Sequence, residues 1–580
     1  MNIRDILENS IMTALLDLKI DSLVIPNINL EHPEDISNGD YSVNVAMILS
    51  KKLARNPREL AENIVTEINR NLPKEIQKVE VAGPGFINFY LSKEFFEKKV
   101  KEIISEKDNF GKNKKLNNQK TIIEYTDPNP FKEFHIGHLM ANAIGESISR
   151  IIESNGADVI RACYQGDVGL HVAKTIWGVK KMIEENHQIK KGFLGNIFGL
   201  GKDDTLWGKA YAYGAENYEG NEIAKKEIVE INKKVYEKND SEVNKIYKIG
   251  RKVSLDKFEK IYKILGTKFN EYFFESQTTD FGRKIVEENL KKSIFEKSEG
   301  AVIFRGENYG LHTRVFINSE GITTYEAKDL GLAKIKHDRC PYEKSIIVTA
   351  NEQSDYFKVL LKALELIYSD LAKKTIHVSH GMLRLPSGKM SSRTGKVITG
   401  EFLLGEIKKL VLEKVKDREM TEEEKNKVAD QVSVGALKYS ILKQTTGKDI
   451  IFDFDKSLSF EGDSGPYLQY SYARARSILK KAEVENVKPS FENNSEINEL
   501  EEMLYRFSEV VERAGDEYSP HHIASYLIEL SSTFNSFYAK GKIVDKESAD
   551  SPYKVALTES FSIILKNGLN LLGIFAPEKM

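Results

Sequence analysis

The sequence predicts a multidomain α/β plus α protein, with a parallel-sheet domain between an N-terminal α+β domain and a C-terminal α-helical bundle. The chain has 580 residues, which at roughly 100–200 residues per domain suffices for about three or four domains. Strand-like and helical patterns alternate between Thr121 and Leu383, which is typical of βαβ units. From Glu401 to the end the pattern is almost wholly helical, so we expect a separate helical domain there.

Composition limits the classes of protein to which the chain can belong. Hydrophobic residues make up 41% and charged residues 30%, which is a globular and not a disordered profile. The net charge is −2, so any nucleic-acid binding must come from local basic patches. Two cysteines, Cys163 and Cys340, are too few for a disulfide framework or a cysteine zinc site, which fits a reducing cytoplasm. The first residues do not resemble a signal peptide, and the absence of any run of about 18 apolar residues predicts no membrane span.

The N-terminal region predicts a small α+β unit. Apolar residues recur at helical spacing in SVNVAMILSKKL (Ser42 to Leu53) and in PRELAENIVTEINRNL, which begins at Pro57. The stretch KVEVAGPGFINFYLS alternates like a β-hairpin around Gly83-Pro84-Gly85. The polar run GKNKKLNNQK (Gly111 to Lys120) predicts a linker to the next domain.

The segment after this linker predicts a βαβ unit. TIIEYT, from Thr121, is a buried strand, and after a proline-rich loop a helix runs from about His135 to Glu153. DVIRACYQGD, from Asp158, is a second strand, and ligands of such folds bind at the carboxyl ends of the strands. Residues from about 180 to 265 are rich in Lys and Glu and predict a solvated helical insertion. Alternating strand and helix patterns resume in AVIFRG, RVFIN, TTYEAKDLGLAKIKH, KSIIVTA and TIHVSHGML.

Two histidines, His135 and His138, stand where the first strand of this unit gives way to its helix. A zinc site would need a third ligand, and neither an HExxH motif nor a cysteine pair accompanies them. Ordinary packed or surface histidines are the plain alternative. The unpaired N–H groups and positive dipole of a helix N-terminus favour a bound anion, to which imidazole N–H groups can also donate. Gly137 leaves room for a flat ring, so the position suits a nucleoside triphosphate.

A second motif, LPSGKMSSRTGK (residues 385–396), gathers Lys389, Arg393 and Lys396 with glycines and hydroxyl residues. It lacks the spacing of a phosphate-binding P-loop, and a solvated basic turn is the plain alternative. A flexible lysine can, however, follow the charge that develops on a leaving pyrophosphate, and such differential binding lowers a reaction barrier.

His135-Ile136-Gly137-His138 and Lys389-Met390-Ser391-Ser392-Arg393 resemble the two signature motifs of class I aminoacyl-tRNA synthetases. Over nearly its whole length the chain resembles the arginyl-tRNA synthetases, in the blocks NGDYSVNVAMILSKKLARNPRELA, VEVAGPGFINF, EYTDPNPFKEFHIGHL, GDVGLHV, TTYEAKDLGLAKIK, GALKYSILK and GPYLQYSYARARSI. The resemblance implies a Rossmann-type catalytic domain that activates L-arginine with ATP and Mg²⁺ to arginyl-adenylate. Transfer of the arginyl group to the 3′ end of tRNA(Arg) would follow.

The same resemblance implies four regions: a tRNA-elbow-contacting domain at 1–112, a catalytic domain at 118–400, a helical connector at 401–455 and an anticodon-binding domain at 456–580. It also implies a monomer, with no protein-bound structural metal. By this resemblance, the expected catalytic residues are His135, His138 and Lys389. The residues expected to bind ATP are Gly137, His138, Met382, Lys389, Ser391 and Arg393. The residues that the resemblance implies for arginine binding are Glu124, Asn129, His135, Tyr325, Asp329 and Gln353. Those that it implies for tRNA binding are Phe86, Asn88, Tyr470, Arg474 and Met580.

Physical chemistry supports parts of this assignment. Carboxylates accept a guanidinium fork bidentately, and Tyr325 and Asp329 lie one helical turn apart, although a helix-start aromatic and a surface acid would give the same pattern. In GPYLQYSYARARSILKK, aromatic residues interleaved with arginines can stack bases and pair with phosphates, although an ordinary amphipathic helix with basic edges would look alike. Phe86 could likewise fill the core of the N-terminal domain.

Other functions stay open at this point. Another class I synthetase, such as a class I lysyl enzyme, would share the nucleotide site. A non-catalytic RNA-binding relative has no need of His135, His138 and Lys389 together, so the intact set disfavours it. A small-molecule adenylyltransferase is disfavoured by the basic-aromatic helix that follows the α/β domain.

Overall fold

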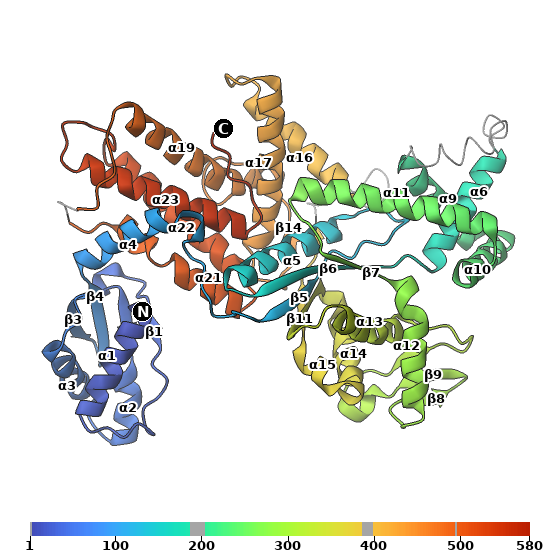
Figure 1. Ribbon diagram of the computed structural model, residues 1–580, viewed down its shortest axis with the longest axis horizontal. Coiled ribbons are helices and arrows are strands. Elements are labelled where there is room, and N and C mark those ends of the chain that lie inside the picture. The colour runs from blue at the N-terminus through green and yellow to red at the C-terminus, as the bar shows by residue number, and fades with distance from the viewer. Residues whose placement is uncertain (1–2, 186–203, 385–397, 493–495) are drawn as a thin grey trace. The chain divides into compact units, whose positions relative to one another are not determined.

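A computed structural model describes residues 3–185, 204–384, 398–492 and 496–580. The chain divides into two compact units (Figure 1). The first comprises residues 1–110, 474–508 and 529–565, and the second comprises residues 111–473, 509–528 and 566–580. Among the described residues, every helix is too short or too polar to cross a membrane.

The N-terminal part of the first unit is a four-stranded antiparallel sheet covered by helices. Its strands lie in the order β1-β2-β4-β3. The elements are α1 (Ile3–Asp17), β1 (Leu30–Glu31), β2 (Tyr41–Val43), α2 (Val45–Leu53), α3 (Pro57–Arg70), β3 (Ile76–Ala82), β4 (Phe86–Leu91) and α4 (Lys93–Glu106). The predicted hairpin is confirmed, since β3 and β4 pair directly across the turn at Gly83-Pro84-Gly85. Gly85 has φ +134, and a Cβ there would lie 2.9 Å from the Pro57 carbonyl oxygen, so the turn requires glycine.

The helix predicted from Ser42 to Leu53 begins later than its apolar spacing suggests. Ser42 and Val43 belong to β2, which pairs with β4, and the helix starts at Val45. The apolar residues at the end of the strand also fit the spacing of the helix that follows, so the sequence pattern does not separate the two elements. The pairing of Ser42 and Val43 with residues 88 and 87 of β4 makes them part of the strand.

The second unit contains a five-stranded parallel sheet in the order β12-β11-β5-β6-β7. Its strands are β5 (Lys120–Glu124), β6 (Asp158–Gln165), β7 (Glu271–Phe274), β11 (Lys344–Ala350) and β12 (Thr375–His380). The predicted βαβ unit is confirmed, because α5 (Ile136–Ser154) connects the parallel neighbours β5 and β6. The predicted α/β plus α fold class is therefore what the chain adopts.

Alternate residues of β5 contact opposite faces of the sheet. Ile122 packs in a cluster with Leu332 of α13 (Tyr325–Arg339), and Glu124 binds Lys336 of the same helix. Tyr125, which follows the strand, meets α5 instead, since a Cβ on Gly145 would lie 2.2 Å from its ring. The two-residue period of a strand thus aims a carboxylate at one helix and an aromatic ring at another.

The predicted insertion is helical, but it is not simply solvated. Its described residues belong to the end of α6 (Leu170–Glu185), which begins before residue 180, and to α9 (Asp204–Gly220), α10 (Glu222–Glu237) and α11 (Ser241–Leu265). These helices enclose an apolar cluster that includes Trp177, Trp207 and Ile228. The abundant Lys and Glu occupy the outward positions, so composition alone hid the apolar face.

Two of the strands predicted after this insertion do not join the parallel sheet. β9 (Ala301–Phe304) and β10 (Arg314–Ile317) form a separate antiparallel sheet with β8 (Glu296–Ser298). Their connection, residues 305–313, is shorter than the dozen or more residues that a parallel crossover requires. The helices of this region are α12 (Glu275–Leu290), α13, α14 (Ser354–Ile367) and α15 (Ser369–Lys374).

The described chain from Gly400 onward is helical, as predicted, except for one short strand. β14 (Ile450–Ile451) pairs with β13 (Leu383–Arg384). The helices are α16 (Gly400–Val415), α17 (Glu422–Leu442), α18 (Phe454–Ser457), α19 (Gly465–Val484), α20 (Glu499–Leu504), α21 (Phe507–Asp516), α22 (His521–Ala539) and α23 (Ser551–Leu571).

Candidate active site

A strained loop leads from β5 into α5. Thr126, Asp127 and Phe131 all have positive φ, at 77°, 47° and 70°, a conformation that costs non-glycine residues roughly 1–3 kcal/mol each. Side-chain bonds hold the loop: the Tyr164 N–H donates to Asp127 at 2.7 Å, and the Phe131 N–H donates to Ser254 at 2.9 Å. Such strain is typical of a site at which the chain must present several groups from a short segment.

The two histidines form the N-terminal cap of α5. The Gly137 N–H donates to Nδ1 of His135, and the His135 N–H donates to Nδ1 of His138, both at 3.1 Å. The two rings are stacked with centroids 3.6 Å apart. A Cβ on Gly137 would lie 3.0 Å from the His135 ring, so glycine lets that ring fold over the backbone. Each Nδ1 is therefore engaged within the cap.

These contacts fix the protonation of both rings. Burial, reinforced by His135 and Lys132, holds the pKa of His138 well below its ordinary 6.5. Burial and Lys132 likewise lower the pKa of His135. Both imidazoles are neutral at pH 7, and because each Nδ1 accepts a hydrogen bond, the proton of each ring is on Nε2. The cap thus offers two neutral Nε2–H donors at the positive end of a helix dipole.

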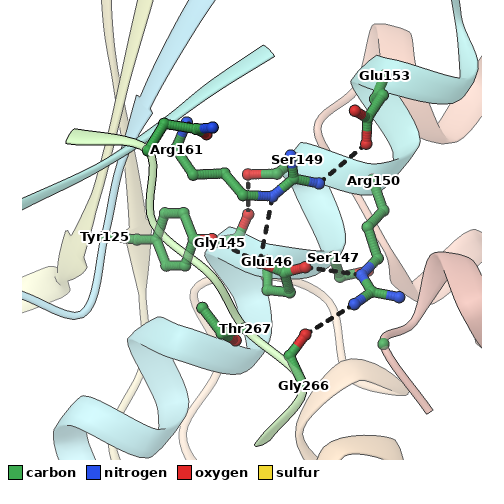
Figure 2. A network of polar contacts seen from close by, with 12 residues as sticks. Tyr125, Gly145, Glu146, Ser147, Ser149, Arg150, Glu153, Arg161, Gly266 and Thr267 are labelled. Atoms are coloured by element: carbon green, nitrogen blue, oxygen red, sulfur yellow. Dashed lines mark hydrogen bonds and ion pairs between the residues drawn. The ribbon is translucent and has the colours of Figure 1, made fainter. Parts of the chain in front are cut away.

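A polar network anchors the middle of α5 (Figure 2). The Tyr125 hydroxyl donates to Glu146 Oε2 at 2.6 Å, and Arg150 Nε donates to Glu146 Oε1 at 2.7 Å. Arg150 also donates to the Gly266 carbonyl at 2.9 Å, while Arg161 lies 3.4 Å from Glu146. Since Glu146 is buried, these partners balance its charge and fix α5 against the sheet and the end of α11.

Two carboxylates, those of Glu124 and Asp329, line one pocket where β5 ends and α13 passes. Glu124 accepts a bond from Lys336 Nζ at 2.7 Å, and both side chains are almost fully buried. Asp329 accepts a bond from the Tyr356 hydroxyl at 2.5 Å. Burial raises the pKa of Asp329 to about 7, and the negative charge of Glu124 contributes in the same direction. Lys336 pairs directly with Glu124, and Asp329 forms no ion pair among the described residues, so a cationic ligand would stabilise the charge of Asp329.

A second polar group lies at the carboxyl end of β6. The Gly166 N–H donates to Asn129 Oδ1 at 2.9 Å, and a Cβ on Gly166 would lie 2.4 Å from that oxygen. Glu275, at the start of α12, accepts a bond from Lys328 Nζ at 2.7 Å in a buried ion pair. Lys328 Nζ also lies 5.2 Å from the centre of the Tyr325 ring.

The other predicted site residues are placed as follows. Tyr325 is 64% exposed, and Gln353 is exposed at the end of a short 3₁₀ turn. The Met382 N–H donates to Asp449 at 2.9 Å. Lys389, Ser391 and Arg393 lie outside the described residues.

The predicted tRNA contacts differ in their exposure. In the hairpin, Phe86 is 38% exposed, whereas Asn88 is buried and accepts a bond from the Ser42 hydroxyl at 2.7 Å. Tyr470 and Arg474 are both half-buried on α19; the Arg474 guanidinium donates to Asn535 and lies over the Tyr538 ring. Met580 is half-buried.

Sequence reasoning did not find Lys336, Tyr356, Lys328 or Glu275, the residues that set the charge of the pocket. One signal was available: Lys336 follows Asp329 by seven residues, so both lie on one face of a helix, and a lysine on a buried face needs a partner. Tyr356 and Glu275 gave no such signal, because they come from α14 and α12.

Comparison with known proteins identifies the family. The family model described as "tRNA synthetases class I (R), catalytic domain" matches residues 99–454, more than half of the chain. The model of the arginyl tRNA synthetase N-terminal domain matches residues 3–91, and the DALR anticodon binding domain matches residues 468–580. The chain belongs to the arginyl-tRNA synthetase family.

Curated relatives and solved structures of arginyl-tRNA synthetases resemble the chain over its whole length. The arginine–tRNA ligase of Clostridium acetobutylicum is 32% identical over 95% of this chain and 96% of its own. That of Fusobacterium nucleatum is 34% identical over 93% of each chain. The Thermus thermophilus arginyl-tRNA synthetase superposes with a TM-score of 0.78 at 25% identity and covers 100% of both chains. The predicted family and its Rossmann-type catalytic fold are therefore confirmed, while the roles of individual site residues stay predictions.

Proposed function

We propose that the chain is an arginine–tRNA ligase, which activates L-arginine with ATP to arginyl-adenylate and then transfers the arginyl group to the 3′ end of tRNA(Arg). The observation that carries this proposal is Asp329, a half-buried carboxylate that forms no ion pair among the described residues. It lines one pocket with Glu124 at the end of β5, the strand that precedes the histidine-capped α5. The names of the relatives, at 32% and 34% identity over nearly the full chain, support the same substrate.

The first step needs positioning and charge stabilisation rather than a protein nucleophile. The arginine carboxylate oxygen attacks the α-phosphorus of ATP, a new P–O bond forms, and the bond to pyrophosphate breaks. His135 and His138 would donate from Nε2 to the triphosphate, and holding both substrates together can supply roughly 7–11 kcal/mol of the barrier. Mg²⁺ would enter with the phosphate oxygens of ATP, where it usually keeps several waters. Because both rings are neutral, donation continues unchanged across neutral pH.

Recognition of arginine is proposed to rest mainly on Asp329. Its carboxylate can accept a guanidinium fork, and Tyr325 and Gln353 would bracket the same end of the substrate. Glu124 keeps its bond to Lys336, so it would add negative potential more than a direct ion pair. Asn129, held by Gly166, would contact the other charged end of arginine. A site built on such hydrogen bonds can reject analogues that lack them by roughly 10⁴–10⁵.

We further propose that residues 1–112 and 456–580 bind tRNA, through Phe86, Asn88, Tyr470, Arg474 and Met580, and that residues 118–400 carry catalysis with 401–455 as a connector. Lys389 would bind the β- and γ-phosphates of ATP as pyrophosphate leaves. The other residues proposed to bind ATP are Gly137, Met382, Ser391 and Arg393. We also propose a monomer located in the cytoplasm, where the free Cys163 and Cys340 would stay reduced.

ATP–pyrophosphate exchange tests the proposal. The full chain should exchange label with arginine and tRNA present, and neither lysine nor citrulline should replace arginine. Exchange with lysine instead would favour a class I lysyl enzyme, and robust exchange without tRNA would count against the arginyl family's mechanism. Lys389→Ala should lower kcat far more than it raises the KM for ATP, because Lys389 is proposed to act on the leaving pyrophosphate.

A further inference from the structure

Two short segments pair beside the histidines. The Ile136 N–H donates to the Ile398 carbonyl at 3.3 Å, and the Gly400 N–H donates to the Phe134 carbonyl at 2.7 Å. Between these two bonds, His135 and Thr399 form an isolated antiparallel bridge. The backbone that carries His135 is therefore held from one side by residues 398–400.

This pairing is close. A Cβ on Gly400 would lie 2.9 Å from the Phe134 ring and 3.1 Å from Leu139, so only glycine permits the contact. The Phe134 ring also lies near two aromatic rings of α11, at 6.0 Å from Phe258 and 6.3 Å from Tyr262 between ring centres. Helix α11 of the insertion is thus the support on which the paired segments rest.

The two paired segments carry like charges close together. Glu133 precedes Phe134 on one segment, and Glu401 follows Gly400 in the first turn of α16 on the other. Both carboxylates approach the same ammonium, and like charges held so close repel each other. Lys257, on α11, resolves this, since its Nζ lies 3.1 Å from Glu133 Oε2 and 2.9 Å from Glu401 Oε2.

The lysine is well placed to remain charged between these acids. Its side chain is only 17% exposed, and although burial disfavours the ammonium, Glu401 and Glu133 hold the pKa of Lys257 above its usual range. Glu133 in turn lies against α9, where a Cβ on Gly208 would meet its Oε1 at 2.1 Å. The carboxylate therefore has little freedom to move away from Lys257.

We propose that Lys257 is a positioning residue, whose ammonium between Glu133 and Glu401 keeps residues 398–400 paired with residues 134–136 and so fixes the backbone that carries His135. The inference deepens the proposed function, on which its kinetic consequences rest. Without the cation, the two carboxylates drive the two segments apart, and the histidine cap loses its support.

Amide hydrogen exchange of the full chain tests the structural half of the proposal. In Lys257→Met, the Ile136 and Gly400 amides should exchange at least about tenfold faster than in the wild type, because their hydrogen bonds open more often. The matched control is Lys260→Met, an exposed lysine on the same helix, which should change neither rate. The triple variant K257M/E133Q/E401Q removes the repulsion along with the cation and should restore slow exchange. Unchanged exchange in K257M, or equally fast exchange in the triple variant, would overturn the proposal.

Exchange kinetics test the functional half. K257M should lower kcat of ATP–pyrophosphate exchange at least about tenfold and raise the KM for ATP, while the KM for arginine stays within about twofold. A general loss of structure would raise both KM values and would contradict a positioning role. Lys257→Arg keeps the cation and should retain near-wild-type rates, and a K257R variant as impaired as K257M would also count against it. If the wild type shows no exchange with arginine, the proposed function fails, while the amide rates still decide the role of Lys257.

Discussion

Arginine should bind about tenfold more weakly at pH 6 than at pH 8, because binding requires the ionised form of Asp329. Burial raises the pKa of this carboxyl to about 7, the Tyr356 hydrogen bond opposes the rise, and Glu124 and Glu275 add to it. Lys336, the nearby cation, lowers the pKa but is bonded to Glu124. In the free protein Asp329 is therefore about half protonated at pH 7, whereas a bound guanidinium keeps it ionised.

The magnitude follows from linkage. If the bound form stays ionised throughout, the apparent dissociation constant scales with one plus the ratio of protonated to ionised Asp329 in the free protein. That factor is about 11 at pH 6 and about 1.1 at pH 8, a tenfold change or roughly 1.4 kcal/mol. Each arginine that binds should release about 0.9 proton at pH 6 and about 0.1 at pH 8.

Calorimetric titration with arginine, in buffers of different ionisation enthalpy, measures both the affinity and the released protons. Asp329→Asn should bind arginine more weakly, with an affinity that no longer changes between pH 6 and pH 8. Burial lowers the pKa values of His135 and His138 below 6.5, and the Asp329→Asn variant separates the contribution of the carboxyl from any contribution of these rings. A wild-type affinity independent of pH would refute the reasoning. So would an Asp329→Asn variant that keeps the wild-type pH dependence, because another carboxyl, such as Asp127 or Glu275, would then be responsible.

Three further substitutions probe the histidine cap and the support of α5. His138→Ala removes one Nε2–H donor and should lower kcat of ATP–pyrophosphate exchange about 10²–10³-fold, with little change in arginine affinity by calorimetry. Gly145→Ala places a Cβ 2.2 Å from the Tyr125 ring, and overpacking of roughly 1–3 kcal/mol should outweigh the helix-propensity gain and lower the Tm in a thermal scan. Arg150→Met leaves the buried Glu146 with Arg161 as its main cationic partner and should destabilise the fold by about 3 kcal/mol, seen as a lower Tm.

Each of these substitutions has a result that would contradict it. An unchanged kcat in His138→Ala would show that the His138 ring does not bind the triphosphate. Gly405 on α16 provides the control for Gly145, because a Cβ there meets nothing within 4 Å, so Gly405→Ala should raise the Tm slightly. If both glycine variants shift the Tm in the same direction, the close contact with Tyr125 is not the reason that position 145 requires glycine. An Arg150→Met variant as stable as the wild type would mean that other partners suffice for Glu146.

The parts of the site that are local in sequence could be predicted, and the parts that depend on packing could not. His135 and His138 stand at a strand-to-helix junction that apolar periodicity alone reveals, so their position at a helix N-terminus followed directly. That each Nδ1 is occupied by a backbone N–H could not be foreseen, because it depends on ring rotamers. The bond between Glu124 and Lys336 joins residues 212 positions apart, and only the fold brings them together.

The same distinction explains where the fold departs from what the sequence patterns suggest. Periodicity marked residues 301–304 and 314–317 as strands, but which strands they pair with is decided by the length of their connection. Lys and Glu dominate the insertion by count, whereas the buried stripe of Trp177, Trp207 and Ile228 determines how its helices pack. The ion pairs of Lys257 could not be predicted for the same reason, because its partners Glu133 and Glu401 lie far from it and from each other in the sequence.

Aminoacylation of total tRNA with each labelled amino acid in turn tests the central claim most directly. The account predicts that the full chain, with ATP and Mg²⁺, attaches arginine alone to tRNA, and that Asp329→Asn reduces this charging without transferring it to another amino acid. Attachment of lysine in place of arginine, or no attachment of any amino acid, would contradict it.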